Sequence, residues 1–206
     1  MSTTTMTEAR KTPQAILGVV ALWAATVVIG AESGFFASLH QPLIAAIVAA
    51  TIIMPTVLYF LSQRLRAYAE QVGHRPIVLF HTWRIPAALM FFYFGLQGQL
   101  PPAFWILAGT GDFIAGGYAA YLMLRPESTR RYLSFHVFGF LDFVVAVGTG
   151  LTFTLLQDPR MAPIAVLPLA LVPLLGVGLS GATHLIAFDM LRRGVGMAGT
   201  APTHHA

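Results

Sequence analysis

The amino-acid sequence predicts an all-α, polytopic membrane protein: a bundle of six transmembrane helices with both termini in the cytoplasm. Hydrophobic residues make up 56% of the 206 residues and charged residues only 10%, whereas a soluble domain carries roughly 25% charged residues. So few charges leave too little polar surface to cover a water-soluble globule. At about 20 residues per crossing plus short loops, the length accommodates about six crossings.

The predicted organisation is a transmembrane domain between two tails. A polar cytoplasmic tail covers residues 1–13, the six-helix domain covers 14–193, and a disordered cytoplasmic tail rich in Gly, Ala, Thr and His covers 194–206. The six predicted spans are residues 14–31, 42–62, 77–95, 103–124, 133–156 and 161–190.

Each of the first three spans is an apolar run between polar segments. The first is longer than the apolar region of a signal peptide, which has about 7–15 residues, and this favours a transmembrane helix. The second contains Pro55, which predicts a kink. After a polar connector, the third span carries His81 and Arg84, whose spacing places them on one face of a helix.

The last three spans are bounded by turns and by basic connectors. Pro101 and Pro102 precede the fourth span, and proline suits the first turn of a helix. The fifth span follows a polar connector and ends near a second turn. The sixth apolar run is too long for one straight span and contains three prolines. We therefore expect an irregular outer portion, followed by a regular helix from Leu174.

The positions of the basic residues predict the orientation. With six spans, both tails and the connectors after spans two and four lie on one side of the membrane, and all lysines and arginines except two fall in these segments. Those residues are Arg10, Lys11, Arg64, Arg66, Arg75, Arg125, Arg130, Arg131, Arg192 and Arg193. The exceptions are Arg84, which lies within a span, and Arg160, which lies in a connector on the opposite side. Positive charge gathers on the cytoplasmic side of membrane proteins, so we expect a multi-pass protein of the inner (plasma) membrane with both termini in the cytoplasm.

Composition also narrows the chemistry and the partners. The chain has no cysteine, which excludes thiolate metal ligands, cysteine-ligated iron–sulfur clusters and a cysteine nucleophile. Lys11 is the only lysine and precedes the first span, so a retinal Schiff base is excluded. The pI of about 9.9 reflects orientation and contact with anionic lipid, and we expect no nucleic-acid partner. The expected partners are the lipid bilayer and either a second copy or a larger membrane complex.

A polar core is predicted within the spans. Arg84 in the third span, Asp112 in the fourth and Asp142 in the fifth all fall well inside apolar runs. An unpaired charge at the bilayer centre costs at least about 3 kcal/mol, so Arg84 is expected to pair with one carboxylate or to bridge both. The set either serves a function or only locks the helices together.

Three histidines form a second predicted layer. Counted at about 1.5 Å per residue from the cytoplasmic ends of their helices, His81, His136 and His184 lie roughly 5–9 Å inside the membrane. Three imidazoles from three helices can bind a transition metal such as Zn²⁺, Fe²⁺ or Cu. Two of them can instead be axial ligands of haem b. The third interpretation is that no cofactor binds and that the rings only form hydrogen bonds with their neighbours.

Several motifs resemble a family of uncharacterised, small bacterial six-span integral membrane proteins. They are the LPxxF…AGxGD pattern at residues 100–112, the FGxLDxVVAVG pattern at 138–148 and the closing Thr183-His184-Leu185. The resemblance covers spans three to six. It implies that Arg84, Asp112, Asp142 and His184 belong together, without implying a role for them.

These observations lead to one preferred function and two alternatives. The preferred function is binding of a metal or haem b by His81, His136 and His184 for redox or metal-dependent chemistry near the cytoplasmic leaflet. One alternative is a small-solute or proton-coupled transporter, and the other is an accessory subunit of a membrane complex. The sequence names neither a reaction nor a transported solute.

Overall fold

The computed structural model describes residues 3–197, and this part of the chain is helical without strands. Five helices in it are long and apolar enough to cross a membrane. They are Thr12–Glu32, Gln41–Leu61, His74–Leu96, Thr129–Leu155 and Val172–Arg193. The predicted all-α class is confirmed, and these helices support a membrane protein.

The elements follow one another as helices joined by short turns. In chain order they are α1 (Thr3–Glu32), α2 (Phe35–Ser38), α3 (Gln41–Leu61), α4 (Gln63–Val72), α5 (His74–Phe80), η1 (His81–Trp83), α6 (Arg84–Leu96), α7 (Pro102–Met123), α8 (Thr129–Leu155), η2 (Pro159–Ala165), η3 (Val172–Gly176) and α9 (Val177–Arg193).

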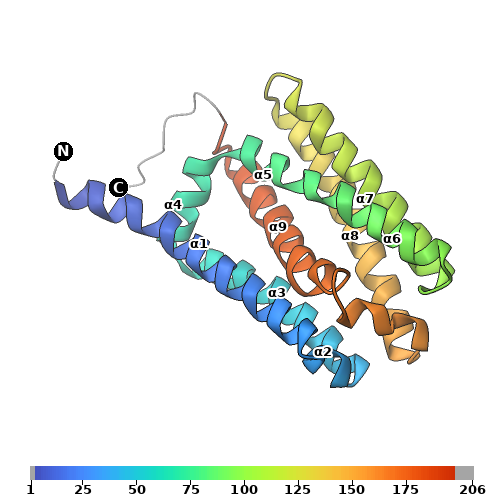
Figure 1. The fold of residues 1–206 in the computed structure, drawn as a ribbon. Helices are drawn as coiled ribbons and strands as arrows, with labels where there is room; N and C mark the ends of the chain where they lie inside the picture. Colours follow the sequence, from blue (N-terminus) through green and yellow to red (C-terminus); the bar gives the residue numbers. More distant parts are fainter. Residues whose placement is uncertain (1–2, 198–206) are drawn as a thin grey trace.

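The last helix, α9, lies in the middle of the molecule (Figure 1). It packs against α3 on one side and against α8 on the other, while α6, α7 and α8 form a row in which each helix contacts the next. A Cβ atom at Gly178 of α9 would lie only 2.6 Å from Thr51 Oγ1 of α3, so this glycine permits the close approach. The α1 helix lies at the edge, where Trp23 Nε1 donates a hydrogen bond to the Leu174 carbonyl (2.8 Å).

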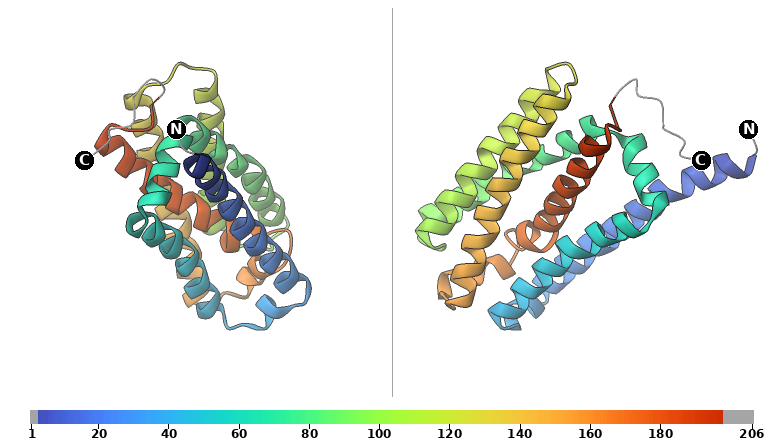
Figure 2. Two further views of the ribbon diagram at one scale, coloured as in Figure 1. Left: turned by 90° about the vertical axis from the view of Figure 1, so that its left-hand side faces the viewer. Right: turned by 180° about the vertical axis from the view of Figure 1, so that it is seen from behind.

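The connecting segments gather at two opposite ends of the bundle (Figure 2). Residues 62–73, 124–128 and 194–197 lie at one end, and residues 33–40, 97–101 and 156–160 lie at the other. Hydrogen bonds join neighbouring segments at the first end: Arg75 donates to the Met123 carbonyl at 2.6 Å and to the Arg125 carbonyl at 3.3 Å. Successive long helices therefore run in alternating directions.

The third predicted span is interrupted. Its helical axis continues from α5 to α6 through η1, a single turn of 3₁₀-helix at residues 81–83. His81 begins this turn and Arg84 follows it, so both candidate site residues flank the interruption. In contrast, α3 continues through Pro55 as one helix. The segment before the third span, predicted as a polar connector, contains the helix α4, which is capped by the Ser62 side chain accepting from the Leu65 amide.

The fourth predicted span is α7, a helix of 22 residues. It is about as long as the five apolar helices, but its mean hydropathy is too low for it to be counted with them. Asp112 and four glycines within it are the physical reason, because these residues contribute little or nothing to the apolarity of the segment. The six-span topology is therefore only partly supported by hydropathy.

The sixth predicted span has the irregular outer portion that its prolines indicated. After the 3₁₀-helix η2, the chain passes through a cis peptide bond at Leu167-Pro168 and through the π-helical η3 before α9 begins at Val177. The first residues of the predicted disordered tail are placed: the Val195 carbonyl lies 3.0 Å from His74 Nε2. The rest of that tail, residues 198–206, lies outside the described residues, as do residues 1–2.

Candidate functional site

Arg84 is the centre of a buried ionic cluster at the start of α6. Its side chain is 3% exposed and contacts both carboxylates of the predicted polar core. Arg84 Nε donates to Asp112 Oδ1 of α7 at 2.6 Å, and Nη2 donates to Asp142 Oδ2 of α8. Nη1 donates to the Gly139 carbonyl at 3.3 Å. One guanidinium thus bridges two helices, the second of the two arrangements expected for it.

Two glycines make room for this cluster. At Gly111 of α7 a Cβ atom would overlap the Asp142 carboxylate, and at Gly139 of α8 it would lie 2.6 Å from His184 Cε1. Any larger residue at either position would occupy space that a charged or imidazole group now fills. Neither glycine was predicted to belong to the site, although both lie within the recurring motifs of the sequence.

The three histidines meet one helical turn away from the ionic cluster. His81, His136 and His184 come from η1, α8 and α9, and none of the three has solvent-exposed surface. The rings of His81 and His184 are stacked with their centroids 4.2 Å apart. His136 Nδ1 lies 2.9 Å from His184 Nδ1, a distance at which one nitrogen donates a hydrogen bond and the other accepts it. We call these three residues the histidine triad.

Each member of the triad retains one nitrogen without a hydrogen-bond partner among the described residues. These atoms are His81 Nδ1, His136 Nε2 and His184 Nε2. Buried polar atoms are paired in the great majority of cases, so three unpaired nitrogens in one cluster are available to a ligand. One potential ligand atom from each residue lies within 4.8 Å of the others.

The surroundings of the triad are aromatic. Phe135 contacts all three rings, with centroid distances of 5.4 Å to His81, 4.9 Å to His136 and 5.9 Å to His184. Thr183 Oγ1 lies 3.2 Å from His81 Nε2, a partner that was not predicted from the sequence. The Thr183-His184-Leu185 motif of the family resemblance was the only sequence signal that Thr183 belongs to the site.

The ionic cluster and the triad adjoin each other across Gly139. Both His184 Nε2 and Arg84 Nη1 lie within 3.4 Å of the point where a Gly139 Cβ atom would stand. Two carboxylates against one guanidinium give the cluster one excess negative charge when both are ionised. That charge favours a cation nearby, and the triad offers it neutral nitrogen ligands.

The geometry fits a metal ion better than it fits a haem. A tetrahedral ion with bonds of about 2.0–2.1 Å holds its ligands about 3.4 Å apart. Potential ligand atoms of the three imidazoles lie within 4.8 Å of one another, so the widest spacing would have to close by at most about 1.4 Å. An axial pair on haem b requires a porphyrin between two rings. The rings of His81 and His184 are stacked with their centroids 4.2 Å apart, which leaves no such slot between them. The ring of His136 stands nearly perpendicular to that of His184, with centroids 5.1 Å apart, so this pair does not enclose a porphyrin either.

The remaining histidines lie apart from the triad. His74, which precedes the predicted third span, is fully buried at the start of α5, and its ring stacks on that of Tyr132 with centroids 5.5 Å apart. Its burial could not be predicted because it depends on the chain after α9 folding back over it. His40 precedes α3 at the opposite end of the bundle, and His204 and His205 lie outside the described residues.

The chain belongs to the family described as "Domain of unknown function (DUF8737)", whose sequence model matches residues 41–192. The expectation of an uncharacterised family is thereby confirmed. The matched range runs from the start of α3 to the last but one residue of α9, and it contains the histidine triad and the whole ionic cluster. Comparisons with curated proteins and with solved structures found no match.

Proposed function

We propose that this protein crosses a bacterial inner membrane six times, with both termini in the cytoplasm, and that its histidine triad binds a transition-metal ion. The fourth crossing is α7, which at about 1.5 Å per residue is roughly 33 Å long and lies between α6 and α8. Its one carboxylate is paired with Arg84, which removes the main obstacle to a place in the bilayer. Basic connectors at one end of the bundle support the orientation.

The observation that carries the metal proposal is the cluster of three buried imidazoles, each of which offers a ring nitrogen within 4.8 Å of the others and keeps one nitrogen without a partner among the described residues. Histidine is the commonest nitrogen ligand for Zn²⁺, Cu and Fe²⁺. Three protein ligands leave a fourth position for water or substrate, the arrangement found at catalytic zinc sites. Binding would break the hydrogen bond between His136 and His184, because the ligands must converge on the ion. A redox or metal-dependent reaction near the cytoplasmic leaflet would follow from such a site.

The test is metal content and cobalt spectroscopy on the detergent-purified chain. The protein should be isolated through a tag other than polyhistidine, with His204 and His205 replaced by alanine so that the tail binds nothing. We expect about one equivalent of a transition metal by elemental analysis. After chelation, added Co²⁺ should produce the visible absorption of a tetrahedral nitrogen and oxygen site.

The matched variants are His136→Ala and His40→Ala. The first removes a triad ligand and should abolish both bound metal and the cobalt spectrum, while the second removes a histidine outside the triad and should change neither. The proposal is refuted if the parent protein binds no transition metal tightly, or if His136→Ala binds it as well as His40→Ala does.

A proton-coupled carrier is the second candidate, and the two interrupted helices favour it. Transporters commonly form their sites at broken helices, and here η1 interrupts the third span beside Arg84 while η3 interrupts the sixth. Reconstituted liposomes with an internal pH dye would detect coupled proton movement. If such flux is absent with an imposed pH gradient and membrane potential across a panel of small solutes, this candidate is rejected.

A further inference from the structure

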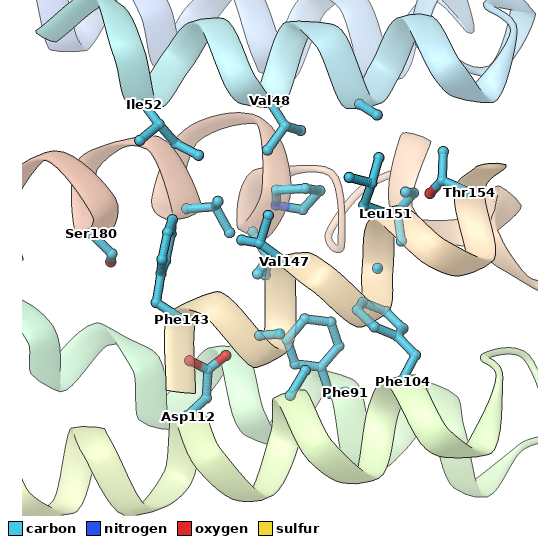
Figure 3. Close-up of a pocket in the computed structure, with 18 of the residues that line it drawn as sticks. Val48, Ile52, Phe91, Phe104, Asp112, Phe143, Val147, Leu151, Thr154 and Ser180 are labelled. Atoms are coloured by element: carbon cyan, nitrogen blue, oxygen red, sulfur yellow. The ribbon is translucent and has the colours of Figure 1, made fainter. Parts of the chain in front are cut away.

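An apolar cavity of about 170 Å³ lies between α3, α8 and α9, above the pair α6 and α7 (Figure 3). Its walls are aliphatic and aromatic over most of their area, with Val48, Val147, Phe91 and Phe104 among the contributors. The cavity does not include the histidine triad, and Arg84 separates the two. The metal proposal therefore leaves this space unexplained.

Polar groups occur at the end of the cavity where Asp112 and Ser180 lie (Figure 3). Asp112 uses Oδ1 to accept the hydrogen bond from Arg84 Nε, and Oδ2 accepts none from the described residues. Ser180 Oγ accepts a hydrogen bond from Trp83 Nε1 at 3.1 Å, which leaves its own hydrogen available. One acceptor and one donor thus face the same space. A hydroxyl group suits such surroundings, because it can both donate and accept.

The charge at this end selects against acids. Arg84 is already bridged by Asp112 and Asp142, so an anionic head group would meet an excess carboxylate in a medium of low dielectric. Fatty acids and phospholipid phosphates are therefore poor occupants. A neutral hydroxyl next to the Phe143 ring and the Trp83 indole, which also line the cavity, fits both the charge and the shape.

The mouth of the cavity lies between α3 and α8. Ala49 of α3 and Leu151 of α8 both line the cavity and are also exposed on the outside of the bundle. Both residues are within helices that are long and apolar enough to cross a membrane, and Ala49 lies near the middle of its helix. A ligand would therefore enter sideways from the hydrocarbon of the bilayer and must itself dissolve in lipid.

We propose that the cavity binds a membrane-soluble phenol or quinol, with its hydroxyl between Asp112 and Ser180 and its apolar tail along α3 and α8. The hydroxyl donates to Asp112 Oδ2 and accepts from Ser180. This binding needs no metal in the histidine triad, so it can be tested on chelator-treated protein, and its failure is separate from failure of the metal proposal.

The test uses Trp83 as a reporter at the cavity wall. In a Trp23→Phe/Trp105→Phe background Trp83 is the only tryptophan of the chain, and a brominated ligand quenches its fluorescence on contact. The probe is 2-bromo-4-octylphenol, added to the protein in lipid nanodiscs. We expect saturable quenching, with at least about tenfold weaker binding of the methyl ether and of the matched 2-bromo-4-octylbenzoate, since a lost hydrogen bond or a repelled charge costs about 1.4 kcal/mol or more.

Two substitutions on one helix locate the binding site. Val147→Phe fills the cavity, whereas Val144→Phe adds the same ring to a side chain that is 50% exposed on α8 and does not line the cavity. The first should remove the saturable quenching and the second should retain it. Equal quenching by phenol, ether and benzoate would overturn the proposal, as would unchanged binding to Val147→Phe or preferred binding of the matched benzylamine.

Discussion

Gly111→Ala should break the ionic cluster without removing any of its charged groups. The alanine Cβ atom would stand inside the Asp142 carboxylate, far closer than the 3.0 Å that real Cβ contacts respect. Because α7 and α8 pack along their length, the carboxylate rather than the backbone is expected to move. Arg84 Nη2 then loses its hydrogen bond to Asp142.

The expected loss of stability in Gly111→Ala depends on which hydrogen-bond partners Arg84 retains. Removing one partner of a buried ion pair costs about 3–5 kcal/mol, but Arg84 retains Asp112 and the Gly139 carbonyl. We therefore expect Gly111→Ala to lower the free energy of unfolding by about 2–3 kcal/mol. In an Asp142→Ala background the obstacle is absent, and the same substitution should cost less than about 0.5 kcal/mol.

The assay is equilibrium unfolding in mixed micelles, in which the fraction of denaturing detergent is raised stepwise and tryptophan fluorescence reports the folded fraction. Gly117→Ala is the matched control, because Gly117 lies on the same helix and nothing stands within 4 Å of the point where its Cβ atom would lie. The reasoning is refuted if Gly111→Ala behaves like Gly117→Ala, or if its cost persists after Asp142 has been replaced.

Three further substitutions test other contacts. Gly139→Ala places a Cβ atom 2.6 Å from His184 Cε1 and should weaken Co²⁺ binding by about tenfold or more; unchanged affinity in a cobalt titration would contradict the proposed ligand set. Tyr59→Phe removes the hydrogen bond to Asp189 Oδ2 (2.8 Å) and should lower the free energy of unfolding by about 1.5 kcal/mol in mixed micelles. Trp23→Phe removes the bond from α1 to a carbonyl of η3 and should cost about 1 kcal/mol, with faster proteolysis between α1 and α3 as a second measure.

Helix content and the candidate residues could be predicted because both depend on local chemistry. Long apolar runs predict helices in lipid, since only a helix satisfies every backbone group within one segment. Within such runs a charged residue or a histidine is conspicuous. Arg84, Asp112 and Asp142 were therefore identified from the sequence together with the requirement that they pair.

The interruptions and the connector helix were harder to predict. The 3₁₀ turn at residues 81–83 lies in a continuous apolar run, and its only local signal was Pro86. Proline removes a backbone donor and disfavours helix in the residue before it, but it does not specify which residues will form a 3₁₀ turn. A proline does not always interrupt a helix either: α3 continues through Pro55.

The amino-acid sequence by itself determined the class of protein, the approximate helices and the set of polar residues that a membrane interior would force into contact. Only the tertiary structure decided that Arg84 bridges both carboxylates, that three imidazoles touch one another, and that Asp112 also faces an apolar cavity. The physical reason is rotation about the helix axis. A span surrounded by lipid is apolar on every face, so its sequence carries little information about which face meets which neighbour.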